Sequence, residues 1–197
     1  METKDGIKTF YAKNRKAWRS WLQKNAASEK SVWLIIHKKD AATKTINYVE
    51  AVEEALCFGW IDSKANKRDE ESYYQFFAKR NPLSNWSKIN KYRVEKLIKN
   101  GLMTPAGIAL IEQAKQNGRW SALDSVESLE LPIDLQTALS NNSEAAYHFE
   151  AFPRSVKKVI LEWIQNARTI ETRDKRIAET VTLASSNIRA NQYKPKR

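Results

Sequence analysis

Cys57, Asp62 and His37 are the side chains that would matter most if this chain were an enzyme. Cys57 and Asp62 flank a Gly-Trp pair in the segment ALCFGWIDS at residues 55–63. A thiol becomes a nucleophile only when a nearby group lowers its pKa. Cys57 lies near the predicted C-terminus of a helix, where the helix dipole raises a thiol pKa. We therefore interpret Cys57 as a small buried hydrophobic residue and predict no catalytic residue.

The two histidines, His37 and His148, lie far apart in the sequence and have no cysteine or carboxylate at ligand spacing. This arrangement predicts no metal site and no cofactor. An acid–base pair between His37 and Asp62 across two strands is one alternative. A structural hydrogen bond is the interpretation that we favour. The sequence lacks the glycine-rich motifs that cradle phosphates and the G-x-S-x-G motif of hydrolases.

A ligand cleft is predicted where the helix before Gly59 gives way to a strand. Alternation along that strand puts Trp60 and Asp62 on one face. The returning strand ends at Arg80, which would pair with Asp62, and a helix capped by Ser84 would add free N–H groups for an anion. The candidate ligand-binding residues are Trp60, Asp62, Arg80, Ser84, Trp86, Ser87 and Asn90. The structural alternative is a capped helix and an ion pair with nothing bound.

The elements that position this cleft are marked by periodicity and by caps. The stretch SVWLIIHKK predicts an inner strand, and residues 60–66 and 72–80 predict a hairpin. Asn47, with Glu50 three residues later, predicts the start of one helix. Thr104 followed by Pro105 predicts the start of another, which runs to Gly118. Alternating apolar and basic residues from Phe10 to Leu22 predict an N-terminal helix.

The second half of the chain is predicted to be helical. Residues 119–131 are expected to form a connector, and further helices begin at Pro132, Ser143, Pro153 and Thr169. The last is expected to have an apolar side made of Ile170, Ile177, Val181 and Ala184. The predicted fold class is α+β: a small antiparallel sheet of about three strands packed with helices, followed by an all-helical C-terminal half. We predict an α+β core at residues 1–120 and a helical segment at 121–197 packed on it.

The composition indicates a cytoplasmic protein with a basic surface. A single cysteine cannot form an internal disulfide, and the densest aliphatic run, residues 32–36, is too short to span a membrane. The net charge is +11, and residues 151–197 carry 11 basic and 4 acidic side chains. The candidate polyanion-binding residues in this tail are Arg168, Arg173, Lys175 and Arg176. Glu171 with Lys175 and Arg176 with Glu179 are spaced for ion pairs, as on an ordinary helix surface.

The order of several motifs resembles the YdeI/OmpD-associated, or bacteriocin-protection, family. The motifs are WRSWL at 18–22, VWL at 32–34, Lys38-Lys39, YVEAVEEALCFGWIDS at 48–63, Arg80, SNWSKINK at 84–91, GLMTPAGIALIEQAKQNGRW at 101–120 and LEWIQNARTIETRDKRIAETV at 161–181. The resemblance implies an α+β N-terminal part with a helical tail, and a link to envelope stress or toxin defence. It implies no reaction, catalytic residue or cofactor.

Together these observations favour a cytoplasmic, non-enzymatic binding protein linked to envelope stress or bacteriocin defence. Its partner would be an unknown small polar or anionic ligand, or another protein. Two alternatives stay open. One is nucleic-acid binding through the basic C-terminal helices, which is not favoured because no exposed aromatic motif accompanies the charges. The other is an enzyme of unknown reaction that uses the Asp62/Arg80 cleft.

Overall fold

The structure is a computed structural model that describes residues 2–192 of the chain. The chain divides into two compact units, Met1–Ser121 and Ala122–Arg197. The first unit contains a β-sheet with helices, and the second is helical within its described residues, so the predicted α+β class is confirmed. No helix within residues 2–192 is both long enough and apolar enough to cross a bilayer.

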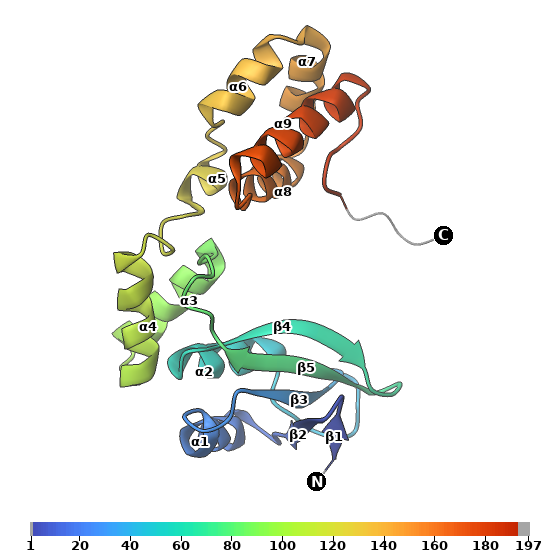
Figure 1. The fold of residues 1–197 in the computed structure, drawn as a ribbon. Helices are drawn as coiled ribbons and strands as arrows, with labels where there is room; N and C mark the ends of the chain where they lie inside the picture. Colours follow the sequence, from blue (N-terminus) through green and yellow to red (C-terminus); the bar gives the residue numbers. More distant parts are fainter. Residues whose placement is uncertain (1, 193–197) are drawn as a thin grey trace. The chain divides into compact units, whose positions relative to one another are not determined.

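The sheet of the first unit is larger than predicted (Figure 1). Its described strands are β1 (Thr3–Lys4), β2 (Ile7–Tyr11), β3 (Ser31–His37), β4 (Trp60–Lys67) and β5 (Ser72–Lys79), in the order β1-β2-β3-β5-β4. Strands β3, β5 and β4 pair antiparallel, as predicted, but β2 and β3 are parallel. The prediction of about three antiparallel strands was therefore too small, and the sheet is mixed.

Phe10 shows why the N-terminal strands were missed. The sequence placed Phe10 on a helix face, whereas it lies in β2 opposite Leu34 of β3. Helix α1 (Arg15–Asn25) begins later, where the side chain of Asn14 accepts a hydrogen bond from the backbone N–H of Ala17. The ring of Phe10 nevertheless contacts Trp21 of α1, at 5.5 Å between ring centroids. The prediction that Phe10 belongs to the N-terminal helix was therefore wrong, although its ring does pack against that helix.

Helices α1 and α2 (Tyr48–Cys57) cover one face of the sheet. Asn47 caps α2 as predicted, because its side chain accepts a hydrogen bond from the N–H of Glu50. Trp18 of α1 donates from its indole to the carbonyl of Ala51 in α2, at 3.0 Å. Apolar residues of both helices form one core with the inward side chains of the sheet, among them Leu22, Val32, Leu34, Ile36, Val52, Leu56 and Phe77.

A buried carboxylate also ties α1 to α2. Glu54 is only 3% exposed and lies 2.6 Å from Nε of Arg15 and 2.7 Å from a terminal nitrogen of Arg19. Arg15 also pairs with Glu53, and Arg19 donates to the carbonyl of Leu102. Glu54 is a desolvated anion, so removing one of its partners would leave a buried charge without compensation.

The C-terminus of α2 meets the N-terminus of α4 (Pro105–Gln116). Thr104 caps α4 as predicted, and its backbone N–H and hydroxyl both donate to the carbonyl of Cys57, at 3.1 and 2.6 Å. Gly107 permits the close approach, because a Cβ there would lie 2.4 Å from the same carbonyl oxygen. After the end of α2, Gly59 turns the chain into β4 with a φ of +75°.

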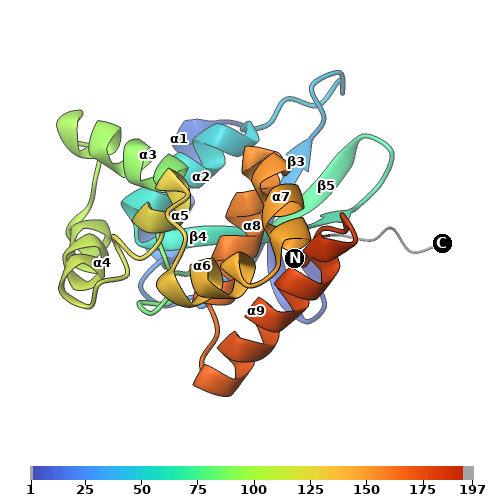
Figure 2. The same cartoon turned by 90° about the horizontal axis from the view of Figure 1, so that it is seen from above.

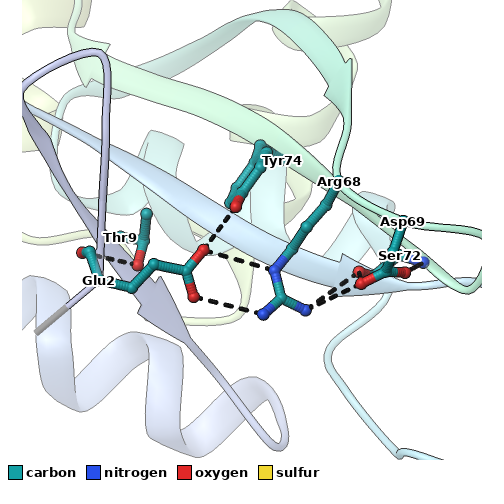
Figure 3. Close-up of polar contacts among 6 residues, drawn as sticks. All are labelled: Glu2, Thr9, Arg68, Asp69, Ser72 and Tyr74. Carbon is teal, nitrogen blue, oxygen red and sulfur yellow. Dashed lines mark hydrogen bonds and ion pairs between the residues drawn. The ribbon is translucent and has the colours of Figure 1, made fainter.

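On the opposite face of the sheet, the N-terminal residue Glu2 contacts Tyr74 and Arg68 (Figure 3). The carboxylate of Glu2 accepts hydrogen bonds from the Tyr74 hydroxyl and from the guanidinium of Arg68, which reach it from β5 and the β4–β5 turn. Lys4 of β1 lies over the ring of Trp33, 5.4 Å from its centroid. The side chains of Glu2 and Lys4 therefore reach across β3, and we call residues 2–4 the N-terminal strap. The Trp33 side chain is fully buried.

The second unit contains α5 (Asp124–Ser128), α6 (Ile133–Ser140), α7 (Ser143–Ala151), α8 (Arg154–Gln165) and α9 (Ile170–Ser185). Helix α9 packs against α6, α7 and α8 (Figures 1 and 2). Thr169 caps α9 as predicted, but Ile170 is 80% exposed rather than buried. The predicted connector at 119–131 contains α5, which was too short to recognise from periodicity.

Candidate functional site

The two tryptophans of the predicted cleft are core residues. Trp60 is fully buried, donates from its indole to the carbonyl of Ala26 at 3.3 Å and packs against Trp21. Trp86 is almost fully buried and contacts Trp120, with 5.1 Å between ring centroids. Neither indole has enough free surface to form the wall of an open pocket.

Arg80 is also buried, with an exposed fraction of 7%. Its guanidinium stacks on Trp86 at 4.0 Å from the ring centroid and donates to the backbone carbonyl of Asn85 at 2.5 Å. Its Nε is buried and has no hydrogen-bond partner among residues 2–192. Burial lowers the pKa of Arg80 to about 10, against the opposite effect of the Asp62 charge. The structure shows a stacked interior cation at this position.

Asp62 has a different partner from the predicted one. Its carboxylate accepts a hydrogen bond from the Tyr48 hydroxyl at 2.6 Å, and within the described residues it forms no ion pair with Arg80. Burial and the hydrogen bond to Asp62 raise the pKa of Tyr48 to about 12. His37 lies opposite Ser72 and Asp62 opposite Phe77, so alternation puts them on opposite faces of the sheet. The structural hydrogen bond between His37 and Asp62 that we favoured was therefore wrong, and so was the alternative acid–base pair.

The helix that follows begins later than predicted. Ser87 caps α3 (Lys88–Lys99) by accepting a hydrogen bond from the N–H of Asn90, whereas the hydroxyl of Ser84 donates to the carbonyl of Asn81 in the preceding turn. The side chain of Asn90 accepts from Arg93 at 2.9 Å. The assignment of the cap to Ser84 was wrong because Trp86 enters the core from extended chain, before the helix begins.

A more open pocket lies at the end of β3, beside the loop that connects β3 to α2. Figure 2 shows the course of this loop. Its volume is about 400 Å³. The floor is apolar, and the wall carries three lysines, one histidine, two tyrosines, two threonines and an asparagine. The lining residues are Ile36, His37, Lys38, Lys39, Ala41, Thr43, Lys44, Thr45, Ile46, Asn47, Tyr48 and Tyr73. None of these twelve residues is acidic. We call this the loop pocket.

Hydrogen bonds fix the loop that forms the pocket. The backbone N–H of Ile46 donates to the carbonyl of Ala12 at 3.0 Å, and the Thr45 hydroxyl donates to the same carbonyl at 3.1 Å. The Tyr11 hydroxyl donates to the carbonyl of Lys44. Lys38 donates to the carbonyl of Glu70 at 2.7 Å. These bonds hold the loop in place, and a loop that is already ordered lowers the entropic cost of binding.

The pocket has polar groups that can receive a ligand. The Nδ1 atom of His37 is buried and has no hydrogen-bond partner within the described chain. Burial raises the pKa of Tyr73, which keeps its hydroxyl protonated and able to donate. The His37 Nδ1 has almost no accessible surface, so its missing hydrogen bond is a cost within the fold and not a contact point for a ligand. Sequence analysis missed this pocket, although the lysine- and threonine-rich run HKKDAATKTIN at 37–47 was a usable signal.

The predicted C-terminal cations are mostly paired within their own unit. Arg173 forms two hydrogen bonds with Asp134, which lowers the pKa of that carboxyl. Lys175 pairs with Glu171 at 2.6 Å, as predicted. Arg176 lies over the ring of Trp163 and donates to its carbonyl rather than to Glu179. Arg168 is exposed. These partners reduce the positive charge that the helices can present to a polyanion.

Cys57 is fully buried, as predicted. Burial, and secondarily the charge of Glu54, raises the pKa of the thiol to about 11. No group of three histidines, cysteines or carboxylates is close enough to hold a metal ion anywhere in residues 2–192.

Comparison with known families divides the chain in two. Residues 10–110 match a family described as a domain of unknown function, DUF8412. Residues 128–187 match a second family, described as "Bacteriocin-protection, YdeI or OmpD-Associated", which confirms the resemblance over that segment. No curated protein and no solved structure matches the chain significantly.

Proposed function

Because the chain belongs to the DUF8412 family and carries a bacteriocin-protection, YdeI or OmpD-associated segment, we propose that it is a non-enzymatic binding protein that takes up a small anionic ligand in the loop pocket. We further propose that it acts in the cytoplasm, in envelope stress or bacteriocin defence. One observation carries the ligand proposal: a cavity of about 400 Å³ has three lysines and no carboxylate in its lining.

The composition of the loop pocket supports an anion with an apolar body. The exposed Lys39 and Lys44 supply positive charge to the lining, and charge-assisted hydrogen bonds are about twice as strong as neutral ones. Ile36 and Ile46 supply an apolar floor. The volume falls within the range of about 300–1,000 Å³ that is usual for small-molecule pockets. A small aromatic or aliphatic carboxylate or phosphate ester fits this combination.

Binding is favoured over catalysis because the reactive groups lie elsewhere or are engaged. The Cys57 thiol is buried outside the pocket lining, and its raised pKa keeps it protonated. The Tyr48 hydroxyl already donates to Asp62. The alternative enzyme site at Asp62 and Arg80 has a buried arginine and no direct pair between the two side chains.

The test begins with the protein purified from its own host and analysed by native mass spectrometry for a retained small molecule. Inorganic phosphate and benzoate then serve as probes in calorimetric titrations at low ionic strength. We expect the double variant Lys39→Gln/Lys44→Gln to weaken probe binding about tenfold or more, since each charged hydrogen bond contributes roughly 1.5–3 kcal/mol.

A matched control is Lys13→Gln/Lys24→Gln, which removes the same charge from exposed positions outside the pocket lining. Equal loss in both double variants would show only a general charge effect, and the pocket assignment would then be wrong. For the cellular role, a strain without the protein should become more sensitive to bacteriocin or envelope stress. Rescue by the Lys39→Gln/Lys44→Gln variant as complete as that by the wild type would separate the ligand from that role.

A further inference from the structure

Most of the positive charge of this chain lies in the first unit. Residues 1–121 carry 23 basic and 13 acidic side chains, a net charge of +10. Residues 122–197 carry 11 and 10, a net charge of +1. The positive charge of residues 151–197 is therefore balanced by acidic residues of the same unit, such as Asp134 and Glu171. A polyanion would be attracted to the first unit.

Within the first unit, α3 presents a regular basic stripe. Lys88, Tyr92, Lys96 and Lys99 follow one another at intervals of four, four and three residues, which places them on one face of the helix. The exposed Glu95 lies on the same face, so the stripe has a net charge of +2. All four are exposed, and Tyr92 has an exposed fraction of 67%. None of the three lysine ammonium groups has a hydrogen bond or an ion pair with any residue from 2 to 192. The opposite side of the helix is anchored in the core by Val94 and Leu97.

We propose that this α3 stripe binds single-stranded nucleic acid without sequence preference. Three ammonium groups along about 17 Å of helix can follow the phosphate backbone, given a rise of about 1.5 Å per residue. The exposed ring of Tyr92 between them offers a surface on which a base stacks. An aromatic ring framed by cations is the combination that single-stranded nucleic-acid sites use. The stripe shares no residue with the loop pocket, so each of the two proposals can be refuted without affecting the other.

The test is fluorescence anisotropy with a labelled oligothymidylate and the full chain, titrated over a series of salt concentrations. Affinity should fall with salt, because bound phosphates release counterions. The triple variant Lys88→Gln/Lys96→Gln/Lys99→Gln should flatten the slope of log K against log salt by about 2, since each phosphate contact to a single strand contributes about 0.7. Tyr92→Ala should weaken binding about tenfold, and Tyr92→Phe should retain it.

Two matched controls remove three cations elsewhere. One is Lys13→Gln/Lys16→Gln/Lys24→Gln in the first unit, and the other is Arg168→Gln/Lys175→Gln/Arg189→Gln in the second. The α3 variant should lose clearly more affinity than either control. Equal losses in all three variants, a larger loss in the second-unit variant, or no binding by the wild type would each overturn the proposal. So would binding to anionic phospholipid vesicles with none to the oligonucleotide. Circular dichroism of each variant verifies that α3 is still folded.

Discussion

Glu54 provides the sharpest test of what holds the first unit together. Its carboxylate is 3% exposed and receives one hydrogen bond from each of two arginines, Arg15 and Arg19. Glu54→Gln keeps the shape of the side chain but removes the charge. It also points an amide NH₂ at one of the two guanidinium groups, where an acceptor is needed.

The size of the effect follows from the exposure of the partners. Breaking a buried ion pair typically costs about 3–5 kcal/mol. Both arginines are about one-third exposed, so water can partly rehydrate them after the change, and Arg15 keeps its pair with Glu53. After this discount we expect a loss of about 2–3 kcal/mol in the free energy of unfolding. Glu53 is more exposed than Glu54 and pairs only with Arg15. Glu53→Gln should therefore cost only about 0.5–1 kcal/mol.

The measurement is urea unfolding followed by tryptophan fluorescence. Six of the seven tryptophans lie within residues 1–121, so the signal reports mainly on the first unit. Glu53→Gln is the matched control, because it makes the same chemical change one residue away on the same helix. If Glu54→Gln proved no more destabilising than Glu53→Gln, the carboxylate would not be the desolvated link between α1 and α2 that its contacts imply.

Two further predictions concern the thiol and the N-terminal strap. Cys57→Ala should cost about 1–2 kcal/mol in the free energy of unfolding and leave ligand binding unchanged. The native thiol, with a pKa of about 11, should react slowly with a thiol reagent at neutral pH. Rapid labelling of the folded protein would contradict its burial. Hydrogen bonds from Tyr74 and Arg68 lower the pKa of Glu2. The contacts of the strap should therefore be stable at pH values above about 4.3, the ordinary glutamate pKa, and should be lost as the pH falls through the lower pKa of the folded state. Hydrogen exchange of residues 2–11 should show that release on acidification, and Glu2→Gln should show it already at neutral pH; equal protection in both proteins would remove Glu2 from this role.

Sequence reasoning succeeded where a local side-chain–backbone contact decides the structure. Asn47, Thr104 and Thr169 each accept the expected hydrogen bond at a helix start, and Gly59 adopts the expected positive φ. Cys57 is buried because it lies on the apolar side of an amphipathic helix. These features depend on a few neighbouring residues, which the sequence displays directly.

It failed where partners distant in sequence decide the outcome. Residues 7–11 became a strand because β3 offers a parallel edge, which nothing within the segment reveals. Ser84 and Ser87 are equally good capping residues, and the burial of Trp86 between them selected the second. The loop pocket combines residues from β3, β5, α2 and the intervening loop, and Tyr73 approaches it through sheet pairing alone. The ion pair between Arg173 and Asp134 likewise joins residues far apart in the sequence, which no local pattern displays.

The joint between α2 and α4 has an electrostatic consequence. The carbonyl of Cys57, at the negative end of α2, occupies the N–H and hydroxyl donors of Thr104 at the positive end of α4. The two helix dipoles are therefore connected head to tail, and each end partly neutralises the other. Helix α4 has the Thr-Pro start of a potential anion site, but a protein carbonyl already fills that position. The N–H and hydroxyl of Thr104 are therefore not free to bind an anion at this helix end.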